Sequence, residues 1–222
     1  MAEVLHSNGF NIVIHYNSSS DAASKLCSKL NQHRTESSII IGGNLTDDSA
    51  IETLIPNVIE QTGRLDVLIN NASTFYPTPI EKITLEDWDN LFGTNLKAPL
   101  FLSKHAAKHL KDSEGSIINI VDIHARKPLK NHPVYGPAKS GLAMLTKASR
   151  TTTEEPVRLQ AAIADLDAKT TDKSLAATRV LLAGGEASIV ELVAAAVKTP
   201  TPKNRDQILR TMLQQILKAS VT

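Results

Sequence analysis

The 222-residue sequence contains 24 basic and 23 acidic residues, for a net charge of +1, and 41% of its residues are hydrophobic. A chain of this length fits one domain around a single core. Its balanced charge provides no extended positive field, which argues against nucleic acid or an anionic membrane as a partner. No segment approaches the roughly 20 apolar residues of a membrane helix, and the first residues do not resemble a signal peptide. We therefore expect a cytoplasmic protein that acts on a small molecule.

Strands and helices alternate regularly through the first two thirds of the chain. Short apolar runs bounded by Gly or polar clusters predict strands at residues 10–16, 38–41, 65–69 and 116–121. Apolar residues at helical spacing predict helices at residues 21–30, before Gly63, from Thr84 onward and at 135–150. This alternation predicts an α/β fold with a doubly wound parallel sheet, Rossmann-like, which binds ligands beyond the carboxyl ends of its strands.

The character of the sequence changes after residue 150. We assign residues 1–150 to a Rossmann-like core and residues 151–222 to a divergent, mostly helical continuation of the same domain. Within the continuation we expect a short strand at residues 179–182 and a helix near residues 189–197. The only cysteine, Cys27, is predicted to be an inert core residue. With no Cys/His cluster, the sequence predicts no metal site.

Tyr135 and Lys139 lie four residues apart at the start of a predicted helix, so both side chains project from one face. An ammonium group near a phenol lowers the pKa of the tyrosine and makes it a usable proton donor. The same spacing also occurs on ordinary surface helices, and context must decide between these interpretations.

That context is a fixed order of further motifs. The sequence Asn-Asn-Ala-Ser at residues 70–73 follows an apolar strand, Asn95 lies on the apolar face of the next helix, and Asp122 ends a strand before Tyr135 and Lys139. This order resembles the short-chain dehydrogenase/reductase family. Residues 70–79 and 120–122 are similar to those of pteridine reductases within that family, and the resemblance extends over residues 2–150.

The resemblance implies a role for each residue of the motif. Tyr135 and Asp122 would deliver a proton to a ring nitrogen, Lys139 would tune Tyr135 and hold the nicotinamide ribose, and Asn95 would position a water. Most family members have serine where Asp122 stands, whereas pteridine reductases have aspartate. The structural alternative for Asp122 is a carboxylate that caps a loop. Phe75 would stack a flat pterin against the nicotinamide, or alternatively serve as a core residue.

The resemblance also implies a nicotinamide cofactor. The residues expected to contact it are Asn17, Ser18, Asn44, Leu45, Asn71, Ala72, Ser73, Tyr135 and Lys139. An acidic residue after the first predicted strand would select NAD. Asn17 and Ser18 stand there instead, which favours NADP, although no arginine is present to pair with the extra phosphate.

Both ends of the sequence differ from the family pattern. Residues 2–8 resemble the end of the family's first helix, so we expect the first strand and its glycine-rich phosphate loop to be missing, and the sheet to be incomplete. Its centre would then hold a gap or a substitute strand from the C-terminal third, for example from residues 179–185. We expect an NADPH-dependent reductase of pterin or dihydrofolate-like rings, assembled as a homo-oligomer. The alternatives are a carbonyl reductase with another substrate and an inactive member that binds or oligomerises.

Overall fold

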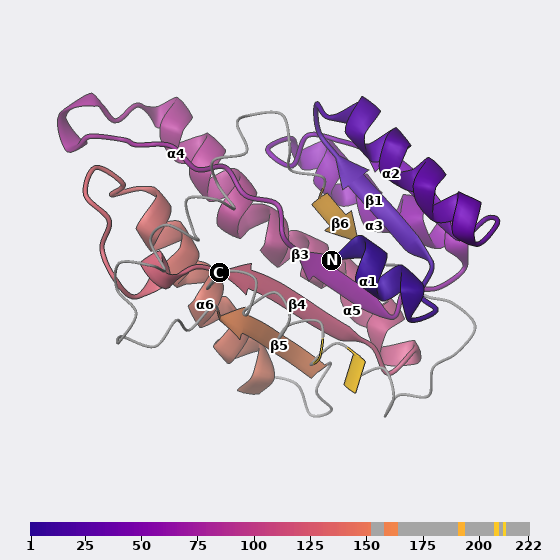
Figure 1. The fold of residues 1–222 in the computed structure, drawn as a ribbon. Helices are drawn as coiled ribbons and strands as arrows, with labels where there is room; N and C mark the ends of the chain where they lie inside the picture. Colours follow the sequence, from indigo (N-terminus) through magenta and orange to yellow (C-terminus); the bar gives the residue numbers. More distant parts are fainter. Residues whose placement is uncertain (152–157, 164–190, 194–206, 209–210, 212–222) are drawn as a thin grey trace.

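The computed structural model describes residues 1–151, 158–163, 191–193, 207–208 and 211. The described elements alternate between helix and strand along the chain (Figure 1). Their bounds are α1 Ala2–Ser7, β1 Ile12–Tyr16, α2 Ser20–His33, β2 Ser38–Gly42, α3 Asp48–Thr62, β3 Val67–Asn70, η1 Ile80–Lys82, α4 Leu85–Phe92, η2 Gly93–Lys97, α5 Ala98–Asp112, β4 Ser116–Val121, η3 Ile123–Ala125, α6 Tyr135–Thr151, β5 Arg158–Ile163 and β6 Glu191–Val193.

The strands form two hydrogen-bonded groups, in the orders β2-β1-β6 and β3-β4-β5. Strand β1 is parallel to β2, and β4 is parallel to both β3 and β5. The β6 strand runs antiparallel to β1, with Ile14 opposite Leu192, and it lies beside β3. In Figure 1, β6 therefore occupies the space between β1 and β3. The predicted Rossmann-like arrangement of helices and parallel strands is confirmed.

The C-terminal third differs from the sequence-based expectation in two places. Residues 158–163, which we expected in a mostly helical continuation, form the strand β5 and pair with β4 along its whole length. The expected helix near residues 189–197 is wrong at Glu191–Val193, because these residues form β6. At the centre of the sheet we expected a gap or a substitute strand. The structure has the strand β6 there, paired with β1 but not with β3, whereas residues 179–185, named as a possible source, lie outside the described residues.

Two apolar clusters cover the two faces of the sheet. Residues of α3 and α5, including Ile55 and Ala106, pack on one face against Leu68 of β3 and Ile117 of β4. Residues of α1 and α2 pack on the other face, where Leu5 is fully buried. Because side chains alternate between faces along a strand, both faces of β3 and β4 are buried, as expected for parallel strands.

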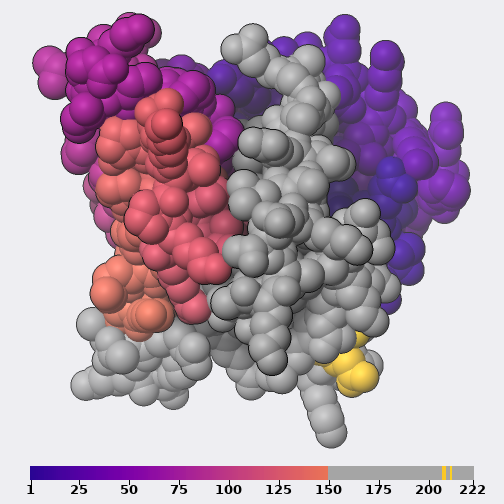
Figure 2. Space-filling view, turned by 60° about the vertical axis from the view of Figure 1, so that its left-hand side comes forward, coloured from indigo at the N-terminus to yellow at the C-terminus, as the bar shows by residue number. Residues whose placement is uncertain are grey.

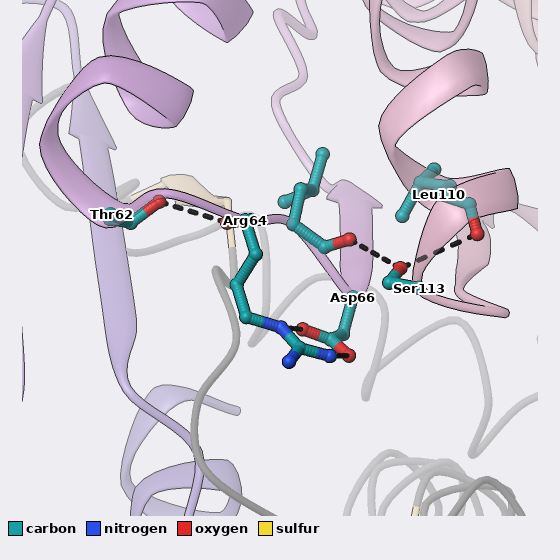
Figure 3. Close-up of polar contacts among 6 residues, drawn as sticks. Thr62, Arg64, Asp66, Leu110 and Ser113 are labelled. Atoms are coloured by element: carbon teal, nitrogen blue, oxygen red, sulfur yellow. Dashed lines mark hydrogen bonds and ion pairs between the residues drawn. The ribbon is translucent and has the colours of Figure 1, made fainter.

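Polar contacts tie β3 to the end of α5 at the edge of the sheet where β3 begins (Figure 3). Arg64 donates two hydrogen bonds to the carboxylate of Asp66, at 2.9 and 2.7 Å. The Ser113 hydroxyl donates to the carbonyl of Leu65 at 2.6 Å. Gly115 approaches this region so closely that an added Cβ would lie 2.6 Å from the Asp66 carbonyl oxygen. The turn from α5 into β4 is therefore closely packed against β3.

The long helical segment after η1 contains one π-helical turn. Thr84 begins α4 with a capping box, in which its hydroxyl accepts from the backbone N–H of Asp87 while the Asp87 carboxylate accepts from that of Thr84. The π turn η2 then joins α4 to α5 and contains Asn95, whose side chain is fully buried. Single π turns inside helices are frequent at functional sites, and this one places Asn95 beneath the loop that follows β3.

Candidate functional site

The loops that follow β3 and β4 lie side by side, because these strands are parallel and end at the same edge of the sheet. The backbone N–H of Thr78, in the first loop, donates to the carbonyl of Asn131, in the second, at 2.6 Å. Figure 2 shows the magenta segment that leads into α4 beside the red segment that leads into α6, on one face of the molecule. The predicted residues Phe75, Asp122 and Tyr135 all belong to this region.

Tyr135 and Asp122 are in direct contact. The phenolic hydroxyl of Tyr135 donates a hydrogen bond of 2.8 Å to Oδ2 of Asp122. The other carboxylate oxygen, Oδ1, accepts from the backbone N–H of His124 at 2.6 Å, so Asp122 also caps the short helix η3. The loop-capping alternative and the predicted contact with Tyr135 are thus both present in one carboxylate. Tyr135 itself is only 1% exposed.

The pKa of Tyr135 is raised above its ordinary value. Burial of the phenol is the main cause, and the neighbouring Asp122 carboxylate adds to it, because both disfavour a phenolate. The nearby Ser73 hydroxyl acts in the opposite direction. The pKa of Tyr135 is therefore shifted in the direction opposite to the one expected from the Tyr135 and Lys139 pair, and the expected effect of Lys139 itself stays a prediction. Tyr135 is a protonated phenol near neutral pH, and its proton lies on the hydrogen bond to Asp122.

Lys139 is buried one helical turn after Tyr135. Its side chain is 3% exposed, and its ammonium group donates to the carbonyl of Ile120 in β4 at 3.2 Å. Burial lowers the pKa of Lys139 to about 8, while the charge of Asp122 partly opposes this shift. The side chains of Asp122, Tyr135 and Lys139 therefore lie together, as the motif predicted. Tyr135 and Lys139 are buried, and the Asp122 carboxylate is half-buried.

Asn95 and Ser73 form hydrogen bonds beneath the site. The Ser73 hydroxyl donates to the side-chain oxygen of Asn95 at 2.8 Å. The amide nitrogen of Asn95 donates to the carbonyls of Thr74 and Leu91, each at 2.9 Å. The Asn95 side chain thus joins the loop after β3 to α4. Its predicted function of positioning a water is not tested by these contacts and stays a prediction.

Phe75 lies beside Tyr135, but one of its faces is already covered. Its ring meets Tyr135 edge to face, with 4.8 Å between ring centroids, and stacks on the imidazole of His132 at 4.6 Å. Sequence analysis did not identify His132. The available signal was its place three residues before Tyr135, in the loop that leads into α6. A flat ligand that stacks on Phe75 would have to use the opposite face or displace His132.

Five of the predicted cofactor residues fall into two groups. Asn17 and Ser18 are exposed beyond the end of β1, and Asn44 is exposed beyond the end of β2, where its side-chain oxygen accepts two hydrogen bonds from Thr46 at 3.0 Å each. Leu45 and Ala72 are instead buried in the core cluster beneath α3 and α5, so their side chains serve packing.

Asn71 is half-buried at the end of β3 and follows Asn70, whose side chain points into the core. An open cavity of about 610 Å³ lies on the outer side of the loop before α6. Its lining includes His124, His132 and Gly136 but neither Asp122 nor Tyr135.

Among the described residues, no group of three or more His, Cys, Asp or Glu side chains is arranged to hold a metal. The helices that the structure describes are too short or too polar to cross a membrane.

The profile described as short chain dehydrogenase matches residues 1–171. Pteridine reductase 1 of Leishmania tarentolae is 34% identical over 187 residues, which cover 67% of this chain and 65% of the relative. The chain thus spans about two thirds of the length of that relative. These comparisons agree with the family indicated by the order of motifs, and the chain therefore belongs to the short-chain dehydrogenase family, with a pteridine reductase-like sequence.

Proposed function

We propose that the protein is an NADPH-dependent reductase of pterin or dihydrofolate-like rings. One observation carries the proposal, namely the 2.8 Å hydrogen bond from the Tyr135 phenol to the Asp122 carboxylate. A ring nitrogen that gains a proton during reduction needs an acid group beside it. A carboxyl group paired with a phenol provides two exchangeable sites for that proton. The similarity to a pteridine reductase supports the choice of substrate class.

The chain's own residues would manage the proton and the charge. Tyr135 holds its proton at neutral pH because its pKa is raised, and Asp122 accepts a hydrogen bond from it. When the ring nitrogen draws a proton from this pair, the buried Lys139 ammonium would stabilise the negative charge left behind. Phe75 would hold the flat ring on the face that His132 does not cover.

The donor groups present fit a nicotinamide cofactor. Lys139 has three N–H donors, and the only hydrogen bond described for it is the one to Ile120, so donors remain for ribose hydroxyls. Asn17, Ser18 and Asn44 place amides and hydroxyls beyond β1 and β2, without a carboxylate directly after β1 that would repel a 2′-phosphate. When bound, the reduced nicotinamide would supply the hydride.

The test uses purified protein with NADPH and a dihydropterin, followed by the loss of NADPH absorbance. Tyr135→Phe removes the phenolic proton, so kcat should fall by roughly 10² to 10⁴, the usual contribution of a positioned acid. Fluorescence titration should show little change in NADPH binding. Wild-type protein that binds NADPH but does not reduce the dihydropterin would overturn the proposed substrate class.

Asp122→Ser separates the proposed activity from carbonyl reduction. Serine keeps a hydroxyl next to Tyr135 but removes the carboxyl group. We expect pterin reduction to decrease strongly while any reduction of a simple ketone persists. Equal losses with both substrates would show that Asp122 has no special function toward a ring nitrogen.

We further propose that the protein is a cytoplasmic homo-oligomer. Leu100 and Phe101 of α5 and Met144 of α6 are exposed by 41%, 38% and 64%. Apolar side chains grouped on neighbouring helices are typical of surfaces between copies of a chain. Light scattering at micromolar concentration should report a multiple of the 24.0 kDa chain mass. Monomers alone would contradict this assembly.

A further inference from the structure

Beneath the proposed site, three buried side chains form a continuous chain of hydrogen bonds. Asn70 of β3 donates from its side-chain amide to the side-chain oxygen of Asn119 in β4 at 2.7 Å. The amide of Asn119 in turn donates to the hydroxyl of Thr146 in α6 at 2.9 Å. The Thr146 hydroxyl donates to the carbonyl of Leu142, one turn earlier, at 2.8 Å. The chain therefore crosses from strand to strand to helix.

These groups are removed from water. Asn119 is 0% exposed and Thr146 is 1% exposed. A buried amide that loses its partner pays the full cost of desolvation. A movement of α6 along β4 that breaks the bond between Asn119 and Thr146 is therefore disfavoured, in addition to the packing that opposes it.

The same two elements carry the reacting groups. Asn119 precedes Asp122 by three residues, and Thr146 follows Lys139 by seven residues, which is about two helical turns on the same face. Helix α6 is thus joined by three hydrogen bonds to β4 and the residue directly after it: Tyr135 to Asp122, Lys139 to Ile120 and Thr146 to Asn119. Because a helix moves as a stiff rod, a shift at Thr146 would be transmitted to Tyr135.

We infer that Asn119 and Thr146 are positioning residues, which set the placement of α6 along β4 and thereby align Tyr135 and Lys139 with Asp122. Neither residue touches the reacting groups. Their contribution to turnover rests on the proposed function, but their contribution to geometry does not.

The test compares three threonine variants. Thr146→Val keeps the shape of the side chain but removes the hydroxyl, Thr146→Ser keeps the hydroxyl, and Thr53→Val is the matched control. Thr53 makes the same kind of bond to the carbonyl one turn earlier, to Ser49 at 2.8 Å, but on α3 and away from the site. For Thr146→Val we expect kcat to fall by roughly 10-fold or more with little change in KM, since small misplacements of reacting groups are costly. Thr146→Ser and Thr53→Val should stay near wild type.

A second measurement does not depend on turnover. Crystal structures of wild type and Thr146→Val should show the Tyr135 to Asp122 hydrogen bond lengthened from 2.8 Å in the variant and retained in Thr146→Ser. If wild type reduces no pterin, the proposed function fails, while this distance still decides the inference. A folded Thr146→Val protein with an unchanged distance would overturn it.

Thr146→Val leaves the Asn119 amide without its partner and could therefore fail to fold. The triple variant Asn70→Leu/Asn119→Leu/Thr146→Val removes all three polar side chains of the hydrogen-bonded chain, so none of them keeps a buried donor without its acceptor. It should fold, lengthen the Tyr135 to Asp122 distance and lower kcat. A triple variant with the wild-type distance would overturn the inference, because apolar packing would then suffice to place α6.

Discussion

Replacing Lys139 with methionine should stabilise the protein while it disables the proposed reaction. The ammonium group of Lys139 is buried, and this burial lowers its pKa from 10.5 to about 8. Below pH 8 the folded protein therefore holds a charge in a desolvated site. At about 1.4 kcal/mol per pH unit, the difference corresponds to roughly 3 kcal/mol of lost stability. Methionine is an unbranched, apolar side chain that fills the same space without this cost.

The expected change depends on pH in a defined direction. Between pH 8 and 10.5 the unfolded chain binds a proton at Lys139 that the folded chain has released, so this group makes stability rise with pH. The cost of the buried charge is complete below pH 8 and disappears as the pH approaches 10.5. The stability difference between Lys139→Met and wild type should thus be largest at pH 7 and should shrink across this range.

Thermal unfolding followed by circular dichroism provides the measurement. For a chain of this size, roughly 3 kcal/mol corresponds to a rise in Tm of about 6 to 12 °C at pH 7. Lys108→Met is the control, because it makes the same change of side chain at an exposed position of α5. An unchanged Tm at pH 7, or a Tm difference that stays constant from pH 7 to pH 10, would refute the reasoning about the buried charge.

Two further predictions concern the scaffold. Gly115→Ala should lower the free energy of unfolding by about 1 to 3 kcal/mol, because its Cβ would lie 2.6 Å from the Asp66 carbonyl oxygen. Gly63→Ala is the comparison, because Gly63 has open space around it and only its φ of 73° is unfavourable for alanine. It should lower the free energy of unfolding by about 1 to 2 kcal/mol, and a larger loss at Gly63 than at Gly115 would contradict this prediction. Thr84→Ala should lower the free energy of unfolding by about 1 kcal/mol because it breaks the capping box with Asp87, whereas Thr84→Ser should lower it less. Urea titration measures both values, and equal losses for the two variants would contradict the importance of the hydroxyl.

Local sequence patterns predicted the elements whose signals are strong within a short window. Strand β4 is apolar and bounded by Gly115, and the end of α3 is marked by Gly63, which adopts the expected left-handed conformation. Strand β5 was missed because its polar residues, Arg158 and Gln160, interrupt the apolar run. Strand β6 was read as part of a helix, because its short sequence has helical preference and its extended form depends on pairing with β1.

The candidate site was predictable to the extent that its motif is local. The spacing of Tyr135 and Lys139 and the strand end at Asp122 predicted three side chains in one place, and the structure brings them together. The direction of the Tyr135 pKa could not be predicted, because it depends on how deeply the phenol is buried. The stacking of His132 on Phe75 depends on how two loops meet, which neither loop encodes alone.

The position of β6 has a consequence for how the chain folds during synthesis. Ile14 of β1 pairs with Leu192, so more than 170 residues that follow β1 must be made before this contact can form. Until then, the inner edge of β1 and the neighbouring edge of β3 have no β6 between them. Open strand edges are templates for pairing with other chains, and contacts that are distant in sequence form slowly. Nascent chains that stop before β6 should therefore be the ones that most need chaperones.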